Sequence, residues 1–162
     1  MTNITKDEFY MGTAILASLR SKDPKTKVGC CIVDSAGIIL STGYNGFPFG
    51  IKDSKFNWTK IPDKYGAIKH DYVVHAELNA ILNAGGKSLK NAILYTTLFP
   101  CKECAKAIIQ AGIKKVIYLD IKDNSERFKS DFSHMLFDTV GITVKPFNSL
   151  SNIQKLDLNF YS

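Results

Sequence analysis

Two short segments of this 162-residue chain carry side chains that bind transition metals. The first is His75-Ala76-Glu77, and the second, further along the chain, is Pro100-Cys101-Lys102-Glu103-Cys104. Imidazole nitrogen and thiolate sulfur are the ligands that zinc prefers in proteins. The two segments therefore predict a zinc site formed by His75, Cys101 and Cys104.

The number of ligands decides what such a zinc can do. Three protein ligands leave one coordination position for water, whereas four would close the site and make the zinc structural. Zinc lowers the pKa of a bound water from 15.7 toward about 7, so that hydroxide becomes available at neutral pH. Glu77 follows the histidine by two residues and can carry protons beside the metal without binding it. The combination predicts a hydrolytic reaction.

The order H-x-E followed by P-C-x-x-C is the signature of zinc-dependent deaminases, which remove an amino group from a cytosine or adenine ring. In that chemistry we expect Glu77 to take a proton from the attacking water. The same carboxyl group would deliver it to a ring nitrogen and later help protonate the departing amine.

The cysteine pair has two other interpretations. A Cys-x-x-Cys motif alone also occurs in redox proteins and as half of a structural zinc site. The redox interpretation leaves His75-Ala76-Glu77 unexplained, and the structural site needs a fourth ligand. The candidates for a fourth ligand are Cys30, Cys31, His70 and His134. Cys30 and Cys31 are adjacent in an expected strand, so they should point to opposite faces as small core residues. We expect one catalytic zinc per chain.

Helices are well suited to position these ligands. Cys101 and Cys104 are three residues apart and share one face of a helix that begins near Pro100. The N-terminus of a helix favours thiolate over thiol. His75 begins a second helical segment that continues to Ala84. We therefore expect two helix N-termini to meet at one metal.

The remaining sequence alternates between helical and extended patterns. A capping box at residues 5–8 begins a helix that we expect to end at Asp23-Pro24. The other expected helices are His75–Ala84, Cys101–Ala111 and Phe128–Val140. The expected strands are Val28–Val33, Ile38–Tyr44, Ile93–Leu98, Val116–Ile121 and Ile142–Phe147. An initial hairpin followed by crossover connections predicts an α/β fold with a mixed sheet. Residues 43–69 read mostly as a loop, which is long enough to suggest a functional role.

Length and composition set further limits. A chain of 162 residues suits one domain over residues 1–162. No apolar segment is long enough to span a membrane, and the polar N-terminus, Met1–Glu8, does not resemble a signal peptide. Four cysteines do not make a disulfide framework, so we expect a cytoplasmic protein. The net charge of +6 suits nucleic acid or a phosphorylated substrate, but scattered lysines argue against nucleic acid.

Beyond the metal motifs, the chain resembles deoxycytidylate (dCMP) deaminases from about Ser21 to Phe147. The resemblance rests on Lys22-Asp23-Pro24, Lys27-Val28-Gly29, Gly43-Tyr44-Asn45-Gly46-Phe47-Pro48-Phe49-Gly50, His75 to Ile81, Phe99 to Lys106 and Ile108 to Lys114. Among these segments, residues 43–50 discriminate best. Zinc deaminases of other substrate classes share the metal motifs but not this loop.

The resemblance implies a cytidine-deaminase-like three-layer α/β/α fold with a mixed five-stranded sheet. It implies hydrolysis of dCMP to dUMP, which supplies dUMP for dTMP synthesis in pyrimidine metabolism. It also implies that Asn45 hydrogen-bonds the substrate sugar and that Ala76 contacts the substrate. Asn45 equally fits a turn in Tyr44-Asn45-Gly46, and the two interpretations are compatible.

The resemblance further implies regulation. Many dCMP deaminases are homohexamers that are activated by dCTP with Mg²⁺ and inhibited by dTTP, and the loop at residues 43–50 contributes to their effector site. The corresponding residues here are Gly43, Tyr44, Gly46, Pro48 and Gly50. Unregulated relatives exist, so a loop that only shapes the substrate pocket is the alternative.

One segment departs from the family pattern. Relatives often carry an aromatic and a basic residue near the substrate phosphate, where this chain has Asp120-Ile121-Lys122-Asp123. Lys122 can supply the positive charge, but no tyrosine is present. The sequence leaves two interpretations of Lys122 open, namely a phosphate contact or an exposed loop lysine.

Two rival functions remain open at this point. A deaminase of another nucleoside, of free cytosine or of tRNA adenosine would use the same chemistry, although residues 43–50 argue against it. A non-enzymatic zinc protein that binds nucleic acid is a rival of a different class. Such a protein would have no use for Glu77 beside the metal.

Overall fold

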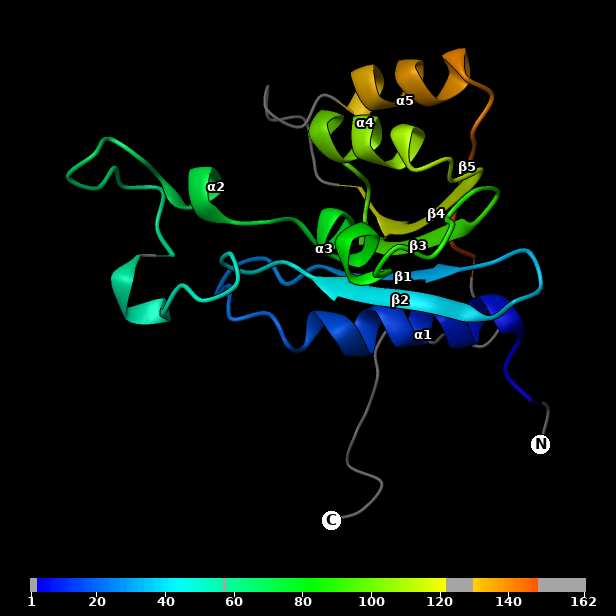
Figure 1. The fold of residues 1–162 in the computed structure, drawn as a ribbon, viewed down its shortest axis with the longest axis horizontal. Coiled ribbons are helices and arrows are strands. Elements are labelled where there is room, and N and C mark those ends of the chain that lie inside the picture. Colours follow the sequence, from blue (N-terminus) through cyan, green and yellow to red (C-terminus); the bar gives the residue numbers. More distant parts are fainter. Residues whose placement is uncertain (1–2, 57, 122–129, 149–162) are drawn as a thin grey trace.

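The computed structural model describes residues 3–56, 58–121 and 130–148, which form a mixed five-stranded sheet between two layers of helices (Figure 1). The strands are β1 (Gly29–Val33), β2 (Ile39–Tyr44), β3 (Ile93–Leu98), β4 (Lys115–Asp120) and β5 (Thr143–Pro146). Their order in the sheet is β2-β1-β3-β4-β5. β1 is antiparallel to β2 and β3, whereas β3, β4 and β5 are parallel. The predicted mixed sheet is confirmed.

The helices cover both faces of the sheet. They are α1 (Lys6–Ser18), α2 (Lys69–Tyr72), α3 (Ala76–Asn83), α4 (Lys102–Gln110) and α5 (Ser130–Thr139), with a 3₁₀ turn η1 at Asp53–Lys55. α1 lies on one face, and α3, α4 and α5 lie on the other (Figure 1). Cys30 packs into the core on the α3–α4 side and Cys31 into the core on the α1 side, so both are core residues on opposite faces, as predicted.

The first helix begins as predicted but ends early. The Thr5 hydroxyl accepts the Glu8 N–H, and the Glu8 carboxylate accepts the Thr5 N–H at 2.7 Å, which completes a capping box. The helix ends at Ser18 rather than at Asp23-Pro24. The next three N–H groups bond to carbonyls three residues back, which tightens the chain into 3₁₀-type turns. The predicted end was wrong because Pro24 only prevents the helix from continuing past it. It does not prevent the helix from ending earlier.

The β1–β2 hairpin brings two glycines against neighbouring helices. A Cβ atom on Gly43 would lie 2.3 Å from the Ala76 carbonyl oxygen and 2.4 Å from the Ala80 nitrogen. A Cβ atom on Gly29 would lie 1.9 Å from the Ala14 carbonyl oxygen. Glycine at these positions lets β2 approach α3 and lets β1 approach α1 closely.

Residues 47–73 leave the sheet as an arm that returns at the start of α3 (Figure 1). An isolated antiparallel bridge between Gly46 and Val74 closes the base of this arm. Inside the arm, the rings of Phe47 and Trp58 stack at 4.3 Å, and those of Phe56 and Tyr72 lie 4.1 Å apart. The predicted long loop is confirmed over most of its length, but the short helix α2 was not predicted.

The other predicted elements agree within two residues where they can be compared. Part of the predicted last helix, residues 128–129, and most of the C-terminal tail fall outside the described residues. Within the described part of the chain, no helix is long and apolar enough to cross a membrane.

Candidate active site

The metal-binding side chains meet where two helices begin. His75 is the N-cap of α3, Cys101 is the N-cap of α4, and Cys104 lies in the first turn of α4. Cys101 Sγ and Cys104 Sγ each lie 3.4 Å from His75 Nδ1. All three ligand atoms lie within 4.8 Å of one another, and together they are the group of possible metal ligands found among the described residues. The sequence-predicted convergence of two helix N-termini is present.

The spacing of these atoms fits a zinc ion. With Zn–S bonds of about 2.3 Å and Zn–N bonds of about 2.0–2.1 Å, a tetrahedral site separates sulfur from nitrogen by about 3.5 Å. The observed 3.4 Å separations match this value. The His134 ring stacks on Phe99 at 4.4 Å between ring centroids and is not among the grouped ligand atoms. The donor set is therefore three side chains, which suits a site with an open position.

The two thiols differ in acidity. A hydrogen bond from Cys104 lowers the pKa of Cys101 to about 3, and a hydrogen bond and the charge of His75 act in the same direction against burial. The same sulfur–sulfur hydrogen bond and burial raise the pKa of Cys104. Because zinc binds thiolates, metal binding at this site must displace the proton from Cys104.

Glu77 lies beside this group and is almost completely buried. Its carboxyl Oε2 accepts a hydrogen bond from Cys104 Sγ at 3.5 Å, and the side chain is 4% exposed. Burial raises the pKa of Glu77 above 4.5, although the charge of His75 opposes the shift. A raised pKa makes a carboxyl group hold a proton more readily than an exposed one does, which suits a group that accepts and returns a proton.

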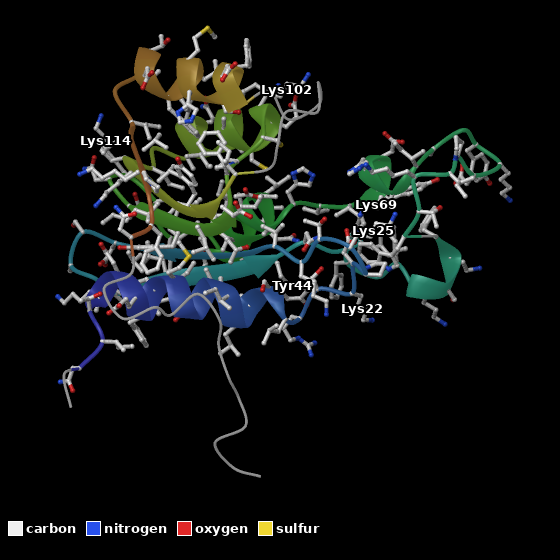
Figure 2. All side chains as sticks on the ribbon, turned by 180° about the vertical axis from the view of Figure 1, so that it is seen from behind. Lys22, Lys25, Tyr44, Lys69, Lys102 and Lys114 are labelled. Atoms are coloured by element: carbon white, nitrogen blue, oxygen red, sulfur yellow. The ribbon has the colours of Figure 1, made fainter. Side chains whose placement is uncertain are left out.

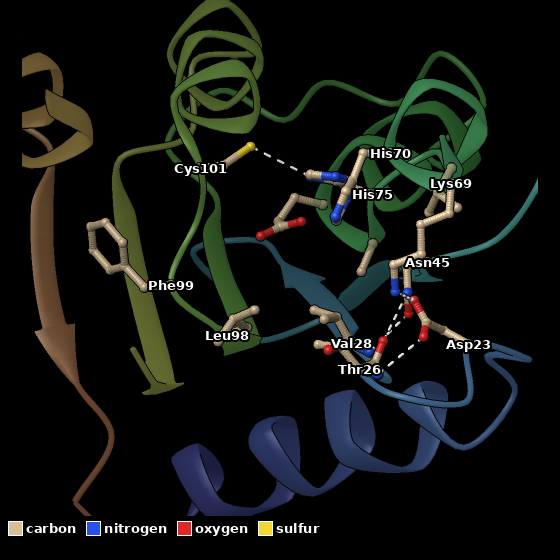
Figure 3. Close-up of a pocket in the computed structure, with 13 residues that line it drawn as sticks. Asp23, Thr26, Val28, Asn45, Lys69, His70, His75, Leu98, Phe99 and Cys101 are labelled. Carbon is tan, nitrogen blue, oxygen red and sulfur yellow. Dashed lines mark hydrogen bonds and ion pairs between the residues drawn. The ribbon is translucent and has the colours of Figure 1, made fainter. Parts of the chain in front are cut away.

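A cavity of about 50 Å³ is lined by two of the predicted metal ligands, His75 and Cys101 (Figure 3), and by Glu77. Its polar lining is Asp23, Thr26, Asn45, Lys69, His70, His75, Glu77 and Cys101. Its apolar lining is Val28, Val73, Ala76, Leu98 and Phe99. Apolar walls with a few convergent polar groups are typical of a site for a flat, partly polar ring such as a nucleobase.

Comparison with known proteins agrees with this geometry. The sequence model of the cytidine and deoxycytidylate deaminase zinc-binding region matches residues 4–120. The chain belongs to the cytidine and deoxycytidylate deaminase family. It is therefore a hydrolytic deaminase, and the enzyme class predicted from the two motifs is confirmed.

Individual family members are similar over most of their length. The probable deoxycytidylate deaminase of Drosophila melanogaster is 49% identical over 146 residues, which are 86% of this chain and 70% of that protein. The deoxycytidylate deaminase of Homo sapiens is 41% identical over 157 residues, which are 96% of this chain and 85% of that protein.

A solved structure supports the same assignment. The dCMP deaminase of the cyanophage S-TIM5, in complex with dCMP and dUMP, superimposes with a TM-score of 0.71 at 29% identity. The match covers 91% of this chain and all of that one. The predicted cytidine-deaminase-like fold is confirmed.

Two further residues that the sequence predicts to contact the substrate lie at this cavity. Asn45 and Ala76 line the cavity beside Glu77. Asn45 is 6% exposed, its Oδ1 accepts the Val28 N–H at 2.8 Å, and its Nδ2 donates to the Thr26 carbonyl at 3.0 Å. Asn45 thus lines the cavity from an extended segment between the end of β2 and the Gly46–Val74 bridge, and not from a turn. Lys122 falls outside the described residues.

The loop at residues 43–50 borders a second cavity of about 230 Å³. This second cavity is lined by Arg20, Lys22, Tyr44, Asn45, Gly46, Phe47, Pro48, Phe49, Gly50, Ile51 and Trp58. Figure 2 places Lys22 and Tyr44 near Lys69, at the end of the sheet from which the arm leaves. Of the predicted effector residues, four line the second cavity, whereas Gly43 packs against α3 instead.

Sequence reasoning missed two charged residues of the cavity beside Glu77. Lys69 Nζ lies 2.6 Å from Asp23 Oδ2, and the two side chains are 5% and 3% exposed. Lys69 comes from α2 in the arm and Asp23 from the loop between α1 and β1. Asp23 belongs to a segment that carried the family resemblance, but nothing local in the sequence pairs it with Lys69.

Proposed function

We propose that this chain is a zinc-dependent dCMP deaminase, which converts dCMP and water to dUMP and ammonia in pyrimidine deoxynucleotide metabolism. The observation that carries the proposal is the grouping of His75, Cys101 and Cys104 around Glu77, beside a cavity that Asn45 also lines. The names of the relatives and the nucleotides bound to the cyanophage enzyme support dCMP as the substrate.

The chemistry follows from the side chains. Zinc, held by His75, Cys101 and Cys104, supplies a water whose pKa is lowered toward about 7 when the metal is bound. Glu77 receives a proton from the nucleophile and passes it to the ring nitrogen N3 of the cytosine. The same carboxyl group then assists protonation of the amino group that leaves C4. Its burial keeps bulk water from competing for these protons.

The rest of the cavity selects the nucleotide. Val28, Leu98 and Phe99 provide apolar walls for the base, and Ala76, at the first turn of α3, lies against it. The Asn45 amide contacts the sugar through the N–H donor and the lone pair that its backbone hydrogen bonds do not use. Lys122 supplies positive charge for the phosphate in this proposal. Its charge would favour dCMP over the uncharged nucleoside.

We also propose regulation through the second cavity, by dCTP with Mg²⁺ as activator and dTTP as inhibitor. The cavity combines the cationic side chains of Arg20 and Lys22 with the rings of Tyr44 and Trp58. Positive charge suits a triphosphate, and aromatic rings suit a base. Asn45 borders both cavities, so occupancy of one can affect the other.

The assembly and location of the protein complete the proposal. A homohexamer is supported by large apolar side chains that are exposed on the helices, namely Phe9, Leu16 and Leu82 at 50%, 48% and 65%. A single catalytic domain over residues 1–162 and a cytoplasmic location are proposed with it. All four cysteines are free thiols, which suits a reducing compartment.

A side-by-side assay tests the substrate. Initial rates on dCMP, deoxycytidine, cytidine, cytosine and an RNA hairpin should favour dCMP strongly. Preference for cytosine or the hairpin would move the chain to another substrate class within the zinc deaminases. A zinc-loaded, folded protein that deaminates none of them would support the non-enzymatic alternative.

A further inference from the structure

The buried pair of Lys69 and Asp23 has no role in the deamination step described above. The two groups lie at the wall of the substrate cavity, and both are more than nine-tenths buried (Figure 3). Removing two charges from water costs free energy that their attraction often fails to return, so a buried ion pair is weak evidence for stability alone. Because the pair lies at the cavity, it can hold other residues of the cavity in place.

A continuous series of hydrogen bonds joins the pair to Asn45. Asp23 accepts Lys69 through Oδ2, and its Oδ1 accepts the N–H groups of Lys25 at 2.9 Å and Thr26 at 3.1 Å. The carbonyl of the same Thr26 accepts Asn45 Nδ2 at 3.0 Å. Asp23 therefore fixes the backbone turn on which one end of the Asn45 amide rests.

The Asn45 amide is oriented by its two backbone partners. An asparagine side chain offers two N–H donors and two acceptor lone pairs. The Thr26 carbonyl uses one donor, and the Val28 N–H uses one lone pair. A flipped amide would place N–H against N–H and oxygen against oxygen. One donor and one lone pair then remain for a ligand, at fixed positions.

We propose that Lys69 is a positioning residue, which acts through Asp23 and the Lys25–Val28 backbone to hold the Asn45 amide at the sugar end of the substrate cavity. The inference rests on the proposed dCMP deaminase activity for its kinetic consequence. Lys69 belongs to the arm, so the pair also ties the arm to the loop between α1 and β1. The substrate pocket thereby depends on two segments that are 46 residues apart.

The effect of losing Lys69 follows from its distance from the reacting carbon. Without the ammonium group, Asp23 must take up a proton or turn toward water, and the turn at residues 25–26 loosens. A sugar contact contributes to substrate and transition state alike, so its loss raises KM and leaves kcat nearly unchanged. The loss of one hydrogen bond between neutral groups, the Asn45 amide and the sugar, corresponds to a KM increase of roughly 2–12-fold.

The test uses three variants of the pair and one control in the full-length zinc-loaded protein. Lys69→Met and Asp23→Asn each leave one buried group without its partner, whereas the double variant removes both charges and keeps an acceptor oxygen at residue 23. Lys60→Met changes an exposed lysine of the same arm and serves as the matched control. Each is assayed for zinc content, thermal unfolding and dCMP kinetics, alone and combined with Asn45→Ala.

We expect the double variant to recover folding while its KM for dCMP stays raised roughly 2–12-fold and its kcat stays close to normal. Adding Asn45→Ala to the double variant should cause little further loss, because both changes remove the same contact. Recovery of normal KM along with stability would overturn the inference and leave the pair a structural feature. Fully additive losses would overturn it as well.

A second readout does not depend on turnover. In ¹⁵N-labelled protein, the Asn45 side-chain amide and the Val28 backbone amide should shift in the double variant and stay in place in Lys60→Met. Unchanged resonances would overturn the positioning role whatever the substrate. If these resonances shift but wild-type protein does not deaminate dCMP, the proposed function fails while the positioning of Asn45 stands.

Discussion

At the scale of single residues, the proposed mechanism depends on Glu77, a carboxyl group that is not one of the predicted metal ligands. Glu77 is buried beside Cys104 and His75, and its burial raises its pKa. A structural zinc site gains nothing from such a group, since an uncompensated buried carboxyl costs free energy. The position of Glu77 is therefore the feature that separates a catalytic site from a structural one.

Glu77→Gln should fold and hold zinc but lose turnover, because an amide cannot transfer protons at neutral pH. Loss of one general acid–base group costs about 10²–10⁴-fold in rate. The measurement is kcat for dCMP with zinc content determined on the same preparation. Glu103→Gln is the matched control, since Glu103 also lies in the first turn of a catalytic helix but is 65% exposed. Near-normal turnover by Glu77→Gln would remove the assigned role.

At the scale of elements, the packing of β2 on α3 places the catalytic helix. Gly43 allows backbone contact with Ala76, which follows His75 directly, and with Ala80, which lies three residues after Glu77. A side chain at residue 43 would push α3 away from the sheet. Gly43 thereby sets the position of the helix that carries His75, the proposed metal ligand, and Glu77, the proposed proton carrier.

Gly43→Ala should destabilise the fold by about 3 kcal/mol, at the upper end for overpacking, because the new methyl group meets rigid backbone. It should also weaken zinc binding through the displaced His75. Gly12→Ala is the control, since a Cβ atom there meets nothing within 4 Å and replacing glycine within α1 should add up to about 1 kcal/mol of stability. Chemical unfolding measures the free energy of unfolding, and a zinc titration measures the affinity for zinc. Equal stability of Gly43→Ala and Gly12→Ala would contradict the packing argument.

The Lys69–Asp23 ion pair, which joins the arm to the loop between α1 and β1, should affect the pH dependence of stability. Burial raises the pKa of Asp23, but the hydrogen bonds from Lys69 and from two backbone N–H groups lower it further, so that it lies below 3.8. The unfolded chain then binds a proton at higher pH than the folded chain. The stability that Asp23 contributes is complete above about pH 5 and is lost as pH falls through its folded pKa.

Unfolding free energies from pH 6 down to pH 3 should reveal this loss in the wild-type protein. The double variant Asp23→Asn/Lys69→Met lacks the titrating group, so its stability should fall less steeply below about pH 4. If the unfolding free energies of the two proteins change in parallel with pH, Asp23 does not pair with Lys69 in solution.

The sequence predicts what is local and misses what is formed by tertiary contacts. His75, Glu77, Cys101 and Cys104 lie in two short motifs. Helix spacing places Cys101 and Cys104 on one face, and the shared signature of the two motifs predicts that they meet at one metal. The strands follow from apolar patterns and agree within one residue at their ends. The buried pair of Asp23 and Lys69 joins residues 46 apart, and neither neighbourhood has a pattern that indicates burial. The early end of α1 has the same origin, because the chain must turn toward β1 before its proline is reached.

At the scale of the whole molecule, the two cavities share Asn45. A ligand in the second cavity can change dCMP affinity only by its differential affinity for two states of the protein. The exposed apolar side chains of α1 and α3 offer surfaces for subunit contacts. Through such contacts, a change of state in one subunit would favour the same state in its neighbours.

We expect sigmoidal dependence of rate on dCMP, made more hyperbolic by dCTP with Mg²⁺ and opposed by dTTP. A coupling of about 1–3 kcal/mol would change the apparent dCMP affinity roughly 5–150-fold. Calorimetry with each nucleotide, combined with initial rates at sub-saturating dCMP and a measurement of oligomeric mass, checks this. Hyperbolic kinetics with no nucleotide bound outside the active site would restrict the loop at residues 43–50 to shaping the substrate pocket.

The most direct test of the central claim is a zinc titration of metal-free protein, with dUMP formation measured at saturating dCMP. Turnover should rise in proportion to bound zinc and stop rising at one zinc per chain. Cys101→Ser and Cys104→Ser should lower the affinity for that single ion. Turnover without zinc, a requirement for two tightly bound ions, or a fully zinc-loaded protein that leaves dCMP unchanged would contradict it.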